Sequence, residues 1–138
     1  MKLSGILFAL LVCLTWGVAQ EIIPLSQVKP GMIGYGMSVF RGSQIERFNV
    51  QVIGIHKGLI PGESVILVRC TPSFGGFDII KSGIIAGMSG SPIYLEGKLA
   101  GALSLGWGFS KEPIAGVTPI ESMIKVTKRP LENKMAAM

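Results

Sequence analysis

Residues 87–102 read GMSGSPIYLEGKLAGA, a serine set among small residues that runs directly into two apolar segments around Glu96-Gly97-Lys98. Two short apolar segments separated by a glycine-containing turn predict a β-hairpin. Small residues on both sides of Ser89 allow a sharp backbone turn, in which neighbouring N–H groups can converge on one point. The stretch therefore predicts a serine hydroxyl presented at the entrance to a hairpin.

The rest of the chain predicts an all-β fold. Nineteen glycines and eight prolines divide it into short β-branched runs, which are typical of sandwiches and barrels. Strands are expected at residues 35–40, 47–56, 65–70, 92–95, 99–105 and 114–118. In the second of these, Phe48, Val50, Val52 and His56 share one parity, which places them on the expected core face.

A short C-terminal helix is expected after the last strand. Pro119 suits the first helical position and Thr118 suits the N-cap. Glu121 stands three residues after Thr118, so the two predict a capping box.

The chain begins with the pattern of a cleaved signal peptide over residues 1–19. A charged start is followed by the apolar run 6–14 and by small residues before Gln20. The run is shorter than the ~20 residues that a bilayer span requires, so no stable span is expected after cleavage. Residues 20–127 are then expected to form one compact domain and residues 128–138 a disordered tail, and the expected location is secreted or periplasmic.

Composition argues against several functions. The net charge of +5 is mild, and no aromatic residues interleave with the bases, which argues against a nucleic-acid partner. One histidine and one cysteine beyond the leader, Cys70, cannot form a metal cluster, so no metal or cofactor is expected. Residues 75–82 fail as a phosphate loop because Ile80 stands where glycine is required. Cys70 ends an apolar run and is expected to be buried.

Serine chemistry is the activity that the sequence favours. Acyl transfer needs an exposed Oγ, a base and N–H donors for the oxyanion, and the Gly-x-Ser-Gly-x-Pro pattern supplies the first and third. The order of nucleophile, hairpin, glycine-rich loop, strand and helix is also that of the C-terminal half of trypsin-like and HtrA-like peptidases, a fold-level analogy. Ser91 is the competing nucleophile by position, but the small-x-Ser-Gly spacing favours Ser89.

The chain resembles the SpoIVB peptidase family of serine peptidases from about Val28 through Ile124. The resemblance rests on residues 28–36, 47–50, 84–92 and 106–120, of which 84–92 is the most specific. It implies a small trypsin-like antiparallel β-barrel acting as an endopeptidase on a protein or peptide substrate. The family nucleophile maps onto Ser89, and Gly87 and Ser89 would donate the oxyanion-hole N–H groups.

The general base is the open part of this comparison. The family's catalytic histidine lies in a Gly-His motif that the chain does not contain, and the family's acidic position falls near Thr71. The single histidine, His56, precedes Asp78 and Ser89 in the order of chymotrypsin-like enzymes, which makes His56 the candidate base and Asp78 the candidate orienting acid.

Each candidate has a plainer interpretation, a structural histidine and a solvated carboxylate. Two functions therefore stay open. One is a secreted serine endopeptidase domain that works through an acyl-enzyme, and the other is a catalytically incomplete β-barrel module that binds a peptide or a partner protein.

Overall fold

Six antiparallel strands close into a barrel in the computed structural model, which describes residues 19–108 and 110–128. The strands follow one another around the barrel in the order β1-β2-β3-β6-β5-β4, and β4 pairs back onto β1. Their bounds are β1 (Ile33–Arg41), β2 (Gln44–Ile60), β3 (Glu63–Pro72), β4 (Pro92–Leu95), β5 (Lys98–Gly106) and β6 (Ile114–Pro119). The predicted all-β barrel is confirmed, and every predicted strand is present.

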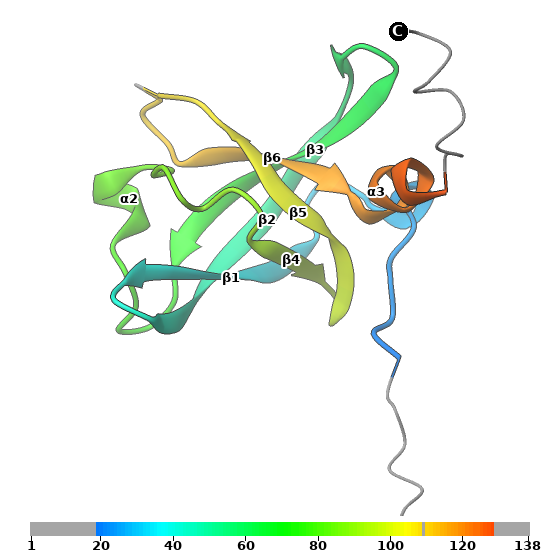
Figure 1. Ribbon diagram of the computed structural model, residues 1–138. Helices are drawn as coiled ribbons and strands as arrows, with labels where there is room; N and C mark the ends of the chain where they lie inside the picture. Colours follow the sequence, from blue (N-terminus) through cyan, green and yellow to red (C-terminus); the bar gives the residue numbers. More distant parts are fainter. Residues whose placement is uncertain (1–18, 109, 129–138) are drawn as a thin grey trace, which may run out of the picture.

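Three short helical segments accompany the barrel. They are η1 (Leu25–Gln27), α2 (Ile79–Ser82) and α3 (Ile120–Thr127). Figure 1 shows α2 and α3 at opposite ends of the barrel, with the β2–β3 hairpin extending beyond its body. The C-terminal helix was predicted, whereas α2 was not, because four residues show no helical periodicity.

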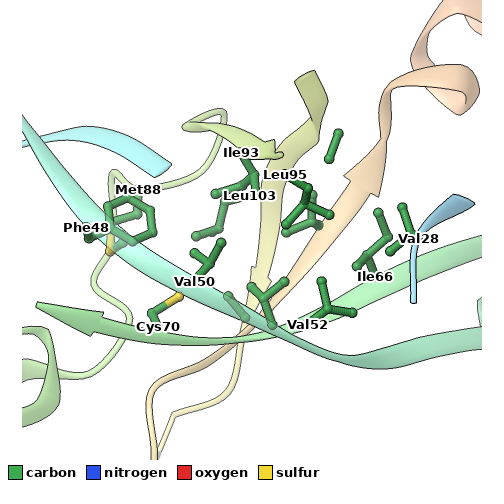
Figure 2. Close-up of a cluster of buried hydrophobic side chains, with 14 of the residues drawn as sticks. Val28, Phe48, Val50, Val52, Ile66, Cys70, Met88, Ile93, Leu95 and Leu103 are labelled. Atoms are coloured by element: carbon green, nitrogen blue, oxygen red, sulfur yellow. The ribbon is translucent and has the colours of Figure 1, made fainter. Parts of the chain in front are cut away.

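The barrel interior holds the hydrophobic core. The side chains drawn in Figure 2 come from segments that lie far apart in the sequence, and they meet in one cluster that includes Phe48, Met88 and Leu103. Cys70 belongs to this cluster, as predicted, and its side chain has no exposed surface. Burial raises the pKa of the Cys70 thiol to about 12, so the thiol stays protonated at physiological pH.

An irregularity in β2 corrects one prediction. Phe48, Val50 and Val52 are buried as expected, but the register with β3 shifts between Val52 and Gly54. An extra residue in one strand reverses the alternation of faces beyond it. Ile55 therefore packs against the core and His56 is exposed, so the expectation that His56 shares the core face is wrong.

The predicted capping box is also wrong. Pro119 is the N-cap of α3 and makes no side-chain cap. The Thr118 hydroxyl donates a 2.8 Å hydrogen bond to the Ser104 hydroxyl, and a Glu121 carboxylate oxygen accepts one of 2.8 Å from the Leu25 N–H. Both side chains thus tie α3 and β6 to other elements instead of closing the helix end.

The two chain ends are described only in part. Residues 1–18 of the predicted signal peptide and residues 129–138 of the predicted tail lie outside the described residues. Just after the predicted cleavage point, the Ile23 N–H donates to the Leu99 carbonyl at 3.0 Å and the Leu99 N–H donates to the Glu21 carbonyl at 2.8 Å. Over residues 19–108 and 110–128, we find no helix with the length and apolar character needed to cross a bilayer.

Candidate functional site

Two consecutive backbone turns present Ser89. The Met88 N–H donates to the Ile85 carbonyl at 3.3 Å, and the Ser91 N–H donates to the Met88 carbonyl at 3.0 Å. The third residue of each turn is a glycine with positive φ, +97° at Gly87 and +87° at Gly90. A type II turn requires this conformation at that position, and glycine adopts it without strain. The glycines on both sides of Ser89 therefore have a backbone reason to be there.

The residue between the two turns fastens them to the barrel. Met88 is 1 % exposed and belongs to the buried cluster in Figure 2, while the residues on either side of it, Gly87 and Ser89, are exposed. A buried side chain at this point holds the backbone in place. The two turns, residues 85–91, therefore form a fixed segment, which we call the serine shelf.

Strand β5 is hydrogen-bonded to the last two residues of the second turn. The Gly90 N–H donates to the Leu103 carbonyl at 2.7 Å, and the Leu103 N–H donates to the Ser91 carbonyl at 2.9 Å. These bonds continue the ladder between β4 and β5 up to the residue that follows Ser89. The serine therefore stands where β4 pairing ends, beside the continuing part of β5.

Two backbone donors of these turns have no hydrogen-bond partner among the described residues. Among hydrogen bonds between the described residues, none uses the N–H of Gly87 or the N–H of Ser89. An oxyanion hole is built from such N–H groups, which must be available to the developing charge. These are the two positions that the sequence predicted for it.

A pocket of about 210 Å³ lies beside the serine. The described residues that line it are Ile84, Ile85, Ala86, Ser89, Leu103, Gly106 and Gly108. This volume is below the roughly 300 Å³ at which small-molecule sites begin, so it suits one side chain better than a whole ligand. Apart from the Ser89 hydroxyl, none of these lining residues has a polar side chain.

The other predicted site residues do not line this pocket. His56 is exposed on β2, where it pairs with Val65 close to the tip of the β2–β3 hairpin. Asp78 caps α2, and its carboxylate accepts a 3.2 Å hydrogen bond from the Lys81 N–H. No hydrogen bond between described residues joins either side chain to Ser89, so the roles assigned to them stay predictions.

Comparison with known proteins identifies the family of this chain. The sequence profile of SpoIVB peptidase S55 matches residues 16–124. The chain belongs to this family. The match spans the whole barrel, so the barrel is a trypsin-like domain of serine peptidase type. No curated protein and no solved structure matches the chain.

Three features of this S55 domain were not found by sequence reasoning. Ser38 supports the serine shelf from β1, while Ile84 and Gly106 shape the pocket. Ser38 lies more than fifty positions from its partner Ser91, and no local pattern marks such a pair. Gly106 carried a signal, since a glycine inside a strand indicates close approach of another group.

Proposed function

We propose that this S55 domain is a secreted serine endopeptidase domain with Ser89 as its nucleophile. The proposal rests on the exposed Ser89 between two glycine turns, on two N–H groups without a partner among the described residues, and on the adjoining pocket. The signal-peptide pattern of residues 1–19 supports the secreted location. A peptidase of this kind acts on a protein or peptide substrate.

The chemistry follows from this arrangement. Ser89 Oγ attacks the carbonyl carbon of a peptide bond while its proton passes to a base, and the Gly87 and Ser89 N–H groups stabilise the resulting oxyanion. Collapse of the intermediate breaks the C–N bond, and the leaving amine takes a proton. Water then hydrolyses the acyl-enzyme ester and restores the hydroxyl.

The base must come from outside the pocket, because its described lining has no titratable group that could accept the proton. The same observation favours a second function. A barrel of this family that has no base would still hold an extended peptide or a partner segment at the shelf without cutting it. The two functions differ only in whether a covalent step follows binding.

A cleavage assay separates the two functions. We expect the purified protein to cut unstructured peptides slowly, to cut them faster when imidazole is added as a proton acceptor, and to lose all cleavage in Ser89→Ala. Ser43→Ala is the matched control, because Ser43 is exposed in the β1–β2 turn and does not line the serine pocket. Equal cleavage by Ser89→Ala contradicts the proposal, and peptide binding without any cleavage favours the second function.

A further inference from the structure

Ile84 stands between two neighbouring pockets. It lines the 210 Å³ pocket beside Ser89 and also a second pocket of about 150 Å³. Gly108 is the other residue that the two pockets share. Lys81 and Glu112 contribute to the lining of the second pocket, whereas the described lining of the first holds no charged residue. The Ile84 side chain is therefore part of the wall that divides the pocket beside Ser89 from a smaller pocket with charged residues in its lining.

Ile84 also contacts the strand that faces the serine. A Cβ added to Gly106 on β5 would lie 2.8 Å from Ile84 Cγ2 and 3.1 Å from Ile84 Cβ. Real Cβ atoms do not come as close as the first of these distances, so the isoleucine fits against the bare glycine backbone. Ile84 and Gly106 therefore lie against each other in the lining of the pocket.

We infer that Ile84 makes the pocket selective for a small, uncharged side chain on the residue whose carbonyl Ser89 attacks. This inference rests on the proposed function. A charged side chain would meet no oppositely charged residue in the described lining, which is unfavourable. A large aromatic side chain would meet the isoleucine wall.

Peptidyl boronates test the inference without requiring turnover. Ser89 Oγ adds to the trigonal boron, an O–B bond forms, and the hydroxyl proton passes to solvent, which leaves a tetrahedral boronate. A series that differs only in the side chain next to boron (alanine, valine, phenylalanine or lysine type) is titrated by calorimetry against the purified protein. We expect the alanine and valine types to bind at least about tenfold more tightly than the phenylalanine and lysine types.

Variants of the wall sharpen the test. In Ile84→Ala the two pockets join, so we expect the phenylalanine-type boronate to bind about tenfold more tightly than to wild type, with a smaller gain in Ile84→Val. Gly106→Ala should weaken the binding of every boronate to the otherwise wild-type protein. The loss should be smaller when Gly106→Ala is combined with Ile84→Ala, because the clashing Cγ2 is then absent. Gly54→Ala is the control, since a Cβ there has open space. Thermal unfolding checks that each variant is folded.

The outcomes separate the inference from the function on which it rests. Equal affinity for all four boronates, or Ile84 variants that leave the order unchanged, overturns the inference while Ser89 keeps its role. Absence of boronate binding to the wild type, or equal binding to Ser89→Ala, contradicts the proposed function and removes the inference with it.

Discussion

The Ser91 hydroxyl donates a 2.9 Å hydrogen bond to the Ser38 hydroxyl, at a place where both residues are only 7 % exposed. Ser38 belongs to β1 and Ser91 follows the proposed nucleophile by two positions. The bond therefore joins the serine shelf to a strand on the other side of β4. Two buried hydroxyl groups satisfy each other there, where either one alone would lack a partner.

Removing one hydroxyl of this pair should lower the free energy of unfolding by more than half of the loss that removing both hydroxyls causes. We expect Ser91→Ala and Ser38→Ala each to lower the free energy of unfolding by about 1–3 kcal/mol, because each leaves a buried hydroxyl unpaired. The double variant should lose clearly less than the sum of the two. Urea unfolding of all four proteins measures this, and strictly additive losses would show that the two hydroxyls do not interact.

Gly87 should tolerate no side chain. Its φ of +97° is unfavourable for an L-residue, so we expect Gly87→Ala to cost about 1–3 kcal/mol of stability or to move the backbone. Either change displaces an oxyanion donor, and acylation of Ser89 should fall by about a hundredfold. Gly54→Ala, at a position without positive φ, should acylate like wild type. A Gly87→Ala protein that acylates at the wild-type rate would exclude the Gly87 N–H from the oxyanion hole.

His56 should not govern the reactivity of Ser89. It is exposed on β2 and does not line the serine pocket, so we expect His56→Gln to acylate within about twofold of wild type. Loss of a true catalytic base would lower the rate by about ten-thousandfold or more. Acylation rates of the two proteins, measured with and without imidazole, decide between these values. A large loss in His56→Gln that imidazole restores would make His56 the base.

Cys70 should give the stability a dependence on alkaline pH. Its thiol has a pKa raised by burial from 9.0 to about 12, so above pH 9 the unfolded chain releases this proton while the folded chain retains it. The protonated thiol's contribution to the free energy of unfolding is fully present below pH 9. It is lost towards pH 12, by about 1.4 kcal/mol for each pH unit. Urea unfolding at pH 8 and pH 10 should show that the free energy of unfolding decreases less between these pH values in Cys70→Ala than in wild type. Equal decreases would mean that the thiol ionises alike in both states.

Local patterns predicted most of the strands and turns, because each depends on residues close in sequence. Gly42, for example, has a φ of +59° in the turn that joins the first two predicted strands. The predicted face of His56 was wrong because the β2 bulge depends on pairing with β3, which alternation along one strand does not reveal.

The site shows the same division between local and distant effects. The turn glycines beside Ser89 could be predicted, since the conformation they adopt is a property of glycine itself. The capping box failed because Glu121 bonds to Leu25, which lies 96 positions away and becomes a neighbour only in the folded barrel. The hydroxyl pair of Ser38 and Ser91 escaped prediction for the same reason.

The most direct test of the central claim is the intact mass of the purified protein after treatment with a fluorophosphonate, with imidazole supplied as proton acceptor. Ser89 Oγ forms a bond to phosphorus, fluoride leaves, and imidazole takes the hydroxyl proton. We predict one adduct per chain, located on Ser89 by peptide mapping and missing from folded Ser89→Ala. No adduct on the folded wild-type protein, or an adduct that persists in Ser89→Ala, would contradict the account.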